Sequence, residues 1–238
     1  MTGPQIDYVL FDLDDTLVDH RAAATTALTH AIERWSPDDH TAHDHDELLA
    51  LWWQIEQEQY DAYLRGECTH AEQRVRRLAQ FLPALGVESG DDAFLTAQFE
   101  DYLVAYVAAW SPFADVPAAL DQLEAAGIGV AVLTNGDPHQ QRLKLQRTGL
   151  LGQFDRVLTP AEVGAPKPDV TAFVNACAML AADPATTAYV GDNLAVDAVG
   201  ATAAGLRGIW LDRPESDATL PPAVTRITSL SALAASLL

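Results

Sequence analysis

Helical and strand-like segments alternate regularly between residues 112 and 212 of this 238-residue chain. Short apolar runs typical of buried strands are separated by longer stretches in which apolar residues recur at helical spacing. Helices are predicted at Val116–Ala126, Pro138–Thr148, Val170–Ala181 and Ala195–Ala204, and strands at Ile128–Leu133, Arg156–Leu158, Thr187–Val190 and Gly208–Leu211. The alternation predicts an α/β fold with a doubly wound parallel sheet, in which ligand-binding groups gather at the carboxyl ends of the strands.

A different pattern occupies the residues before this region. The chain opens with an apolar run, Tyr8-Val-Leu-Phe, that indicates a buried strand. Four helical stretches then follow, at about 19–35, 46–65, 69–83 and 92–109. The first strand can share a sheet with the later strands if this helical block is an insertion after it. We therefore predict a Rossmann-like core domain of residues 1–17 plus 111–238, with an inserted all-helical cap domain of residues 18–110.

The charge balance limits the classes of partner. Fourteen basic residues against thirty-four acidic ones give a formal net charge of −20, which repels nucleic acid and anionic membrane surfaces. A phosphorylated small molecule would also be repelled at long range, so any site for one must supply local positive charge, from a metal ion or a placed lysine or arginine. No signal peptide or run of about eighteen apolar residues is present, so we expect a cytoplasmic protein. The sequence is compatible with a monomer or a homodimer.

Carboxylates lie two residues apart where the first strand ends. In the segment Asp12-Leu-Asp14-Asp-Thr16, the side chains of Asp12 and Asp14 can lean into the same crevice. Two negative charges so near to each other raise the free energy unless a cation compensates them. Mg²⁺ is the natural cation for carboxylate and carbonyl oxygens. Taken alone, an Asp-x-Asp pair is more often a solvated acidic loop.

Polar residues also follow the next predicted strand and a later loop. Thr134 and Asn135 come directly after an apolar run, where a hydroxyl group and backbone amides can hold a phosphoryl oxygen. Lys167 stands between two prolines, which restrict the backbone on both sides and suit a cation that must point at one place. Taken singly, the first feature is more often a turn and the second a surface lysine.

A last acidic pair follows the strand at Thr187–Val190. Asp192 lies at the strand end and Asp197 five residues later at a helix start. Asp192 can complete an oxygen shell around a metal ion. Asp197 can orient the ligands in that shell without binding the metal itself. Helix capping explains both residues about as well when they are considered in isolation.

These features occur together in one order, at strand ends that a parallel sheet brings into one crevice. In this respect the sequence resembles the haloacid dehalogenase superfamily of phosphatases over about residues 1–18 and 112–212. The matching residues are Asp12, Asp14, Thr16, Thr134, Lys167 and Gly191-Asp192 through Asp197. The surrounding stretches resemble subfamily I, with a helical C1 cap after the first motif, which includes nucleotidases and sugar-phosphate phosphatases.

The resemblance implies a mechanism for phosphomonoester hydrolysis. Asp12 is expected to attack the phosphorus atom and form an aspartyl phosphate, while Asp14 acts as general acid and then as general base. The expected Mg²⁺ ligands are the carboxylates of Asp12 and Asp192 and the backbone carbonyl of Asp14. Lys167 is expected to offset the negative charge, and Asp197 to orient the metal shell or Lys167.

The remaining predicted contacts concern the substrate. Thr134 is expected to bond a phosphoryl oxygen, with Asn135 and Thr16 also contributing to substrate binding. In the cap, His20, Arg21 and Arg65 are the residues we predict to select the leaving group. The neighbouring His40, His43 and His45 fit no zinc pattern, and a solvated loop between helices is predicted there.

Three functions are compatible with these motifs. We favour hydrolysis of phosphoric monoesters, on a nucleoside monophosphate or a sugar phosphate. A phosphomutase or phosphotransferase of the same fold is the second, and a non-enzymatic phospho-accepting switch with clustered aspartates, Mg²⁺, a threonine and a lysine is the third. The predicted cap argues against the switch, because a cap suits the closure of a site over a small substrate. Asp14 argues against dehalogenation, since haloacid dehalogenases need no acid for the leaving group.

Overall fold

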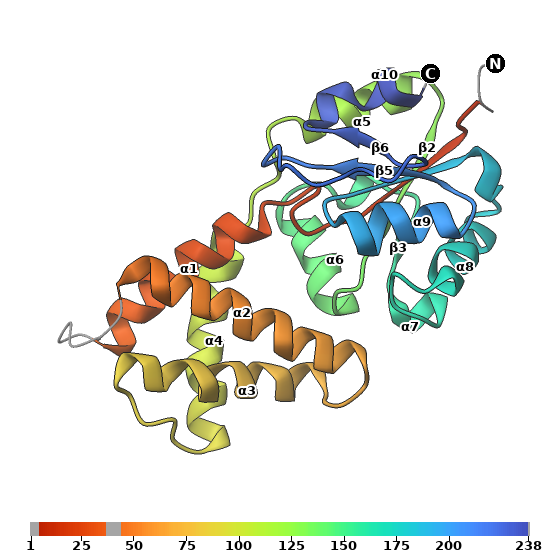
Figure 1. The fold of residues 1–238 in the computed structure, drawn as a ribbon. Helices are drawn as coiled ribbons and strands as arrows, with labels where there is room; N and C mark the ends of the chain where they lie inside the picture. The colour runs from red at the N-terminus through yellow and green to blue at the C-terminus, as the bar shows by residue number, and fades with distance from the viewer. Residues whose placement is uncertain (1–4, 37–43, 238) are drawn as a thin grey trace. The chain divides into compact units, whose positions relative to one another are not determined.

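The computed structural model describes residues 5–36 and 44–237. The chain divides into two compact units, one made of Met1–Asp19 with Ser111–Leu238 and the other of His20–Trp110 (Figure 1). His40 and His43 lie outside the described residues. Within the described ranges, no helix combines the length and apolarity needed to cross a bilayer.

The first unit is built on a parallel sheet of six strands in the order β3-β2-β1-β4-β5-β6. The strands are β1 (Tyr8–Phe11), β2 (Gly129–Leu133), β3 (Val157–Leu158), β4 (Thr187–Gly191), β5 (Arg207–Leu211) and β6 (Thr225–Ile227). The first strand pairs with β2 on one side and with β4 on the other, so it lies at the centre of the sheet. This order confirms the predicted doubly wound parallel sheet, and it places the ends of β1, β2 and β4 next to one another.

Helices pack on both faces of this sheet (Figure 1). They are α5 (Val116–Ala125), α6 (Pro138–Arg147), α7 (Pro160–Val163), α8 (Val170–Leu180), α9 (Gly200–Ala203) and α10 (Leu233–Leu237). Leu10 of β1 and Tyr189 of β4 belong to a buried cluster with residues of α7, α8 and α9, such as Phe173. Helices α5 and α10 cover the opposite face (Figure 1). Burial of this continuous apolar surface is the main force that fixes the strand ends in place.

The segment after β4 differs from the predicted helix at Ala195–Ala204. A π-helical turn, η4 (Leu194–Val199), precedes α9, which begins at Gly200. The Asn193 side chain accepts hydrogen bonds from the amides of Ala195 and Val196, and the Asp197 carboxylate accepts one from the Asn193 amide. Asn193 thus caps the first amides of the segment, which have no backbone acceptor at a helix start.

The second unit is entirely helical within its described residues. Its helices are α1 (His20–Trp35), α2 (His45–Leu64), α3 (His70–Phe81) and α4 (Asp92–Ala108). Capping boxes start two of them, Asp44 with Glu47 at α2 and Thr69 with Glu72 at α3. These signals explain why both helix starts could be predicted to within a residue.

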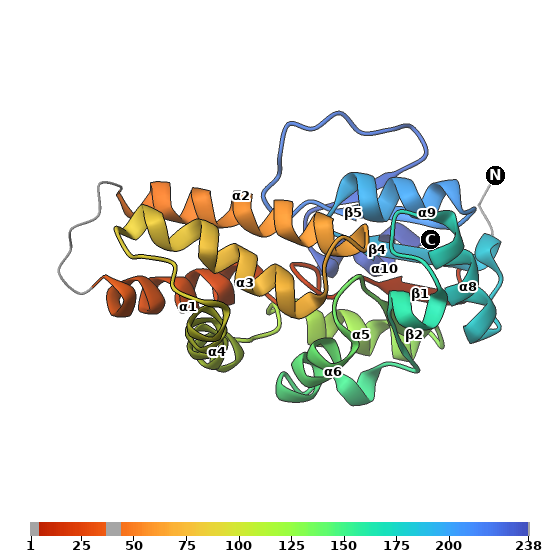
Figure 2. The ribbon, with the colours of Figure 1, turned by 90° about the horizontal axis from the view of Figure 1, so that it is seen from below.

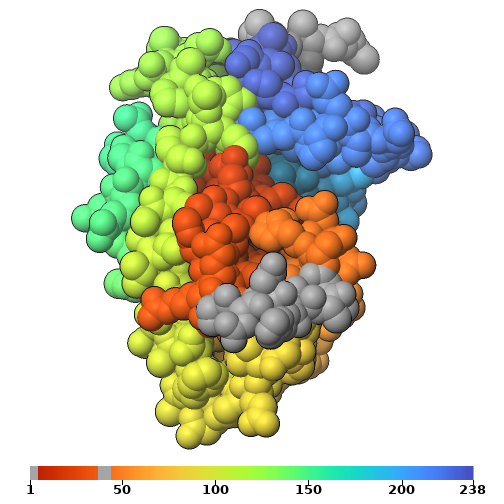
Figure 3. All heavy atoms as spheres, turned by 90° about the vertical axis from the view of Figure 1, so that its left-hand side faces the viewer, coloured from red at the N-terminus to blue at the C-terminus, as the bar shows by residue number. Residues whose placement is uncertain are grey.

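Aromatic side chains fill the interior of the helical unit. Trp52 is fully buried and packs against Phe81, Phe99 and Tyr102. Helices α2 and α3 run side by side (Figure 2), and α1, coloured red, lies against α4 in yellow-green (Figure 3). This core holds together four helices that could not each bury an apolar face alone.

Candidate active site

The first acidic pair follows β1 directly. The Asp12 amide donates a hydrogen bond to the Val190 carbonyl at 2.9 Å, so the chain stays extended for one residue beyond β1. Leu13 is fully buried, and alternation along an extended chain directs its neighbours Asp12 and Asp14 to the other side. Asp15 then adopts a positive φ of 58° and turns the chain away from the sheet. The local backbone therefore presents two carboxylates at the end of the central strand.

Lys167 is the cation of this site. Its ammonium group donates to Asp12 Oδ1 and Asp197 Oδ1, each at 2.7 Å, and to the Tyr189 hydroxyl at 2.5 Å. The Lys167 side chain is 3% exposed. Burial by itself lowers the pKa of Lys167, but the charges of Asp12 and Asp197 outweigh this and raise that pKa above its ordinary value. Lys167 therefore stays charged at neutral pH.

Asn135 fixes the backbone of Lys167. Its side-chain amide donates to the Lys167 carbonyl at 2.9 Å and accepts from the Lys167 amide at 2.8 Å. The side chain of Asn135 therefore aligns Lys167. The predicted part of Asn135 in positioning a phosphoryl oxygen stays a prediction.

The second acidic pair lies at the end of β4 and on η4. The indole of Trp210 donates to the Asp192 carbonyl at 2.8 Å and holds its backbone. Asp197 accepts from Lys167 through one oxygen and from the Asn193 amide through the other. A Cβ atom at Gly191 would lie 2.3 Å from Asp197 Oδ2, so only glycine leaves room for this carboxylate.

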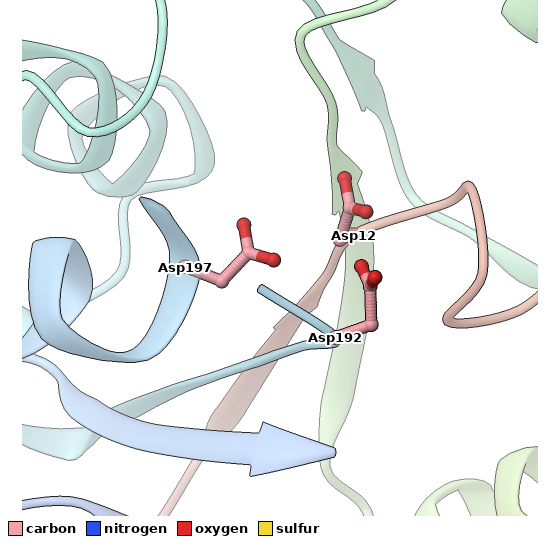
Figure 4. A group of neighbouring side chains, drawn as sticks. All are labelled: Asp12, Asp192 and Asp197. Atoms are coloured by element: carbon pink, nitrogen blue, oxygen red, sulfur yellow. The ribbon is translucent and has the colours of Figure 1, made fainter. Parts of the chain in front are cut away.

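Three carboxylates converge at this edge of the sheet. Asp12 and Asp192 lie next to each other, and Asp197 faces them from η4 (Figure 4). One oxygen from each lies within 4.8 Å of the others, a spacing that can hold a metal ion. Both oxygens of Asp197 accept hydrogen bonds, whereas Lys167 bonds to only one oxygen of Asp12. Asp12 and Asp192 are therefore the carboxylates available to a metal.

The pKa values of the two available carboxyls agree with a cation site. Burial raises the pKa of Asp12 to about 7, a shift that Lys167 partly opposes. Burial also raises the pKa of Asp192 to about 8, and the charges of Asp12 and Asp197 add to the shift. The protein by itself therefore supplies too little positive charge for all three acids. An oxygen-only donor set with this excess of negative charge suits a hard divalent cation.

The two predicted threonines differ in their surroundings. Thr134 follows β2, and its hydroxyl accepts from the Gly136 amide at 3.2 Å and from Gln141 Nε2 at 3.0 Å. Thr16 is fully buried, and its hydroxyl has no hydrogen-bond partner among the described residues. Its carbonyl accepts from Arg213 at 2.9 Å, a contact that anchors the loop after β1. The burial of Thr16 gives no support for the predicted contact with substrate.

Helix α6 supplies two residues that the sequence had not singled out. Lys144 Nζ contacts Asp14 Oδ1, and Gln141 Nε2 donates to Asp14 Oδ2 at 2.7 Å. Both side chains are buried, with Gln141 1% and Lys144 0% exposed. One signal was available: the sequence contains only two lysines, Lys144 and Lys167, so the first is as unusual in this chain as the second.

The three predicted specificity residues belong to the helical unit. His20 Nδ1 lies 2.6 Å from the Tyr106 hydroxyl, and His20 Nε2 lies 3.4 Å from a Glu56 oxygen. The Arg21 guanidinium stacks on Trp53, 4.5 Å from the ring centroid. Arg65 pairs with Glu67 at 2.6 Å and 3.1 Å on the surface. His20 and Arg21 therefore start α1 as part of an aromatic and acidic network, whereas Arg65 follows α2.

Comparison with known proteins places the chain in a family. A model of the haloacid dehalogenase-like hydrolases matches residues 6–205. Ribulose-1,5-bisphosphate 5-phosphatase of Halopiger xanaduensis is 33% identical over 220 residues, 89% of this chain and 87% of that protein. Glyceraldehyde 3-phosphate phosphatase of Methanopyrus kandleri is 30% identical over 225 residues, 91% of each protein.

A solved structure agrees with this assignment. The crystal structure of YfnB from Bacillus subtilis, bound to magnesium, superposes with a TM-score of 0.79 at 25% identity, over 98% of this chain and 99% of that one. The family match runs from before β1 to beyond α9 and so includes Asp12, Lys167, Asp192 and Asp197. The chain therefore belongs to the haloacid dehalogenase-like hydrolase family.

Proposed function

We propose that the protein is an Mg²⁺-dependent phosphomonoester hydrolase that forms an aspartyl phosphate on Asp12. The observation that carries this proposal is the position of Lys167, whose ammonium group lies 2.7 Å from both Asp12 and Asp197. A buried cation beside an acidic cluster is the arrangement that an attack by one anion on another requires. The phosphatase activities of the two curated relatives support the same reaction class.

Asp12 is the proposed nucleophile. In the first step, an Asp12 oxygen forms a bond to phosphorus while the bond from phosphorus to the substrate oxygen breaks. Lys167 offsets the charge that accumulates on the phosphoryl oxygens. The Thr134 hydroxyl already accepts two hydrogen bonds, so its own hydrogen is free to bond a phosphoryl oxygen.

Asp14 is the proposed proton carrier. Its side chain is 32% exposed, so a leaving group and a water molecule can both reach it. In the first step Asp14 gives its proton to the departing oxygen, and in the second it takes one from the water that attacks phosphorus. That attack breaks the bond from Asp12 to phosphorus and releases inorganic phosphate. Proton transfer of this kind accelerates reactions roughly 10²–10⁴-fold.

Mg²⁺ is the proposed metal, with the Asp12 and Asp192 carboxylates and the Asp14 backbone carbonyl as protein ligands. When bound, the ion neutralises the cluster and polarises the phosphoryl group. Asp197 remains behind this shell, where it orients Lys167 through their 2.7 Å hydrogen bond. The raised pKa values of Asp12 and Asp192 support the proposal, because each carboxyl lacks a sufficient counter-charge from the protein.

The proposed substrate is a small phosphorylated metabolite, a sugar phosphate or a nucleoside monophosphate. The relatives named above act on phosphorylated sugars, which supports the first class. The net charge of −20 disfavours nucleic acid as a substrate. Residues His20, Arg21 and Arg65 of the helical unit remain our proposal for contacts that select the leaving group.

Purified protein should hydrolyse p-nitrophenyl phosphate with Mg²⁺, and EDTA should abolish the reaction. Asp12→Asn should remove turnover, whereas Asp217→Asn, an exposed acid outside the site, should leave it unchanged. Mass spectrometry of acid-quenched enzyme should find phosphate on the peptide that contains Asp12. Near-normal turnover by Asp12→Asn would disprove the mechanism.

A second assay separates hydrolysis from transfer and identifies the substrate. A panel of sugar phosphates and nucleoside monophosphates should yield inorganic phosphate and the free alcohol. If the phosphoryl group moved to an added sugar instead, the protein would be a phosphotransferase or mutase. Accumulation of phospho-Asp12 without release of phosphate would indicate a phospho-accepting switch.

A further inference from the structure

Both lysines of the chain contact the acidic pair that follows β1, Asp12 and Asp14. Lys167 contacts Asp12 and Lys144 contacts Asp14. Their side chains are 3% and 0% exposed, respectively. Burial of a lysine is costly unless its charge is paired, so neither residue has the solubility role that lysines usually have at a protein surface. The role of Lys167 follows from its contact with the proposed nucleophile, which leaves Lys144 to be explained.

Helix α6 holds both oxygens of the Asp14 carboxylate. Lys144 contacts one oxygen, and Gln141 donates to the other at 2.7 Å. Residues three apart lie on the same face of a helix, so a single rigid element carries both donors. Two donors on two different oxygens restrict rotation about both side-chain bonds of Asp14. The Asp14 carboxyl group is therefore held in one orientation.

Gln141 also connects Asp14 to Thr134. The same Nε2 atom lies 3.0 Å from the Thr134 hydroxyl and 2.7 Å from Asp14 Oδ2. A Cβ atom at Gly136 would lie 2.2 Å from this amide nitrogen, so the glycine leaves the space that Gln141 occupies. The amide thus sets the separation between the proposed proton carrier and a proposed phosphate-binding hydroxyl.

We propose that Lys144 and Gln141 are positioning residues that hold the Asp14 carboxyl group in the orientation required for proton transfer to the leaving oxygen. The inference rests on the proposed function, because the proton transfer that it concerns is a step in the proposed hydrolysis of phosphomonoesters. Both side chains are buried. Their effect on turnover is exerted through Asp14.

Simple charge compensation is the competing explanation for Lys144. A lysine that only neutralises the acidic cluster would affect all substrates alike, because every phosphomonoester brings the same charge. A lysine that aligns the acid affects substrates according to how much their leaving oxygen needs a proton. Alkoxide leaving groups need one in the transition state, whereas p-nitrophenolate departs readily without one. The leaving group therefore discriminates between the two explanations.

The experiment measures kcat and KM of Lys144→Met with two substrates. One is p-nitrophenyl phosphate, and the other is whichever sugar phosphate or nucleoside monophosphate the wild-type protein hydrolyses fastest. We expect kcat/KM, which reports the step in which the leaving oxygen departs, to fall roughly 10–100-fold for the alkyl substrate and less than about 3-fold for the aryl substrate. Equal losses of kcat/KM for both substrates, or an increase in kcat/KM, would overturn the inference.

Two further variants keep the test decisive. Arg147→Met removes a charge from an exposed position of the same helix and should leave both reactions unchanged. Gln141→Met removes the second donor without changing charge, so it should reproduce the preference for aryl over alkyl phosphate even if Lys144→Met does not fold. Thermal melting of each variant separates loss of stability from loss of turnover.

A double-variant cycle tests the route through Asp14. In an Asp14→Asn background, Lys144→Met should cause no further loss of alkyl phosphatase activity, because the group that it positions is already inactive. Full additivity of the two substitutions would contradict the inference while leaving the proposed function intact. Absence of phosphatase activity in the wild-type protein would instead overturn the proposed function, and this inference with it.

Discussion

The ammonium group of Lys167 lies 2.7 Å from a carboxylate oxygen of Asp12, although 155 residues separate them in sequence. The same nitrogen is 2.7 Å from Asp197, so one cation joins the end of β1 to η4. The contact compensates buried acids, and in the proposed mechanism Lys167 also offsets the charge of a phosphorylated substrate. Four predictions follow from this site and from the charge of the chain.

Lys167→Met should reduce both stability and turnover. Removal of one partner of a buried ion pair leaves uncompensated charge and costs about 3–5 kcal/mol. Chemical denaturation should measure the loss, and kcat for p-nitrophenyl phosphate should fall roughly 10²-fold or more. Adding Asp197→Asn should restore part of the stability and none of the activity. If the single variant were as stable as the wild type, Lys167 would not carry the charge balance of the site.

Mg²⁺ should stabilise the protein more at about pH 8.5 than at about pH 6. The pKa of Asp12 is raised from 3.8 to about 7 and that of Asp192 from 3.8 to about 8. Without metal, the stability that these acids contribute is fully present below their unfolded-state pKa and is lost as pH rises through about 7 to 8.

The metal recovers this loss, because it binds the ionised carboxyls. The Mg²⁺-induced shift in melting temperature, measured by differential scanning fluorimetry, should therefore grow with pH. Calorimetry in buffers of different ionisation enthalpy should detect protons released on Mg²⁺ binding near neutral pH. A shift of constant size from about pH 6 to about pH 8.5 would show that Asp12 and Asp192 are already ionised in the free protein.

Gly191→Ala should impair activity by displacing Asp197. The added Cβ atom would lie 2.3 Å from Asp197 Oδ2, so the carboxylate must move away from Lys167 and the Asn193 amide. We expect kcat to fall roughly 10–100-fold with a smaller change in KM. Gly152→Ala is the matched control, because its Cβ atom would meet nothing within 4 Å. Equal activity of the two variants would mean that the position of Asp197 is unimportant.

Salt should stabilise the protein. A net charge of −20 on 238 residues produces self-repulsion in the folded state. The Debye length falls from about 10 Å at 0.1 M ionic strength to about 3 Å at 1 M, which screens most of this repulsion. The melting temperature should therefore rise between about 0.05 M and 1 M KCl. A melting temperature independent of KCl would argue that the acidic residues are compensated locally.

Several parts of the site could be predicted without coordinates. Asp12, Thr134 and Asp192 each follow an apolar run, and in a parallel sheet such positions lie on one edge whatever the details of packing. The strand order confirms this, because β1 lies between β2 and β4. The prolines on both sides of Lys167 likewise marked a restrained lysine before its partners were known.

Other contacts were not predictable from local sequence. Lys144 lies in a predicted helix. Helical periodicity shows which residues share a face of that helix with Lys144, but it does not show which part of the protein packs against that face. Asn135 bonds to the backbone of a residue 32 positions away, and Thr16 is buried by neighbours from other segments. The π-helical turn that contains Asp197 lies where the Ala-rich sequence predicted a regular helix.

The amino-acid sequence by itself determined the α/β class, the helical insertion and the acidic residues at the strand ends, because these follow from local periodicity and from the geometry of any parallel sheet. Tertiary structure alone decided which cation meets which acid. Lys167 reaches Asp12, and Lys144 reaches Asp14, because the burial of many apolar side chains sets the rotation and depth of each loop and helix against the sheet. These pairings depend on the packing of the whole core, so no short stretch of sequence predicts them.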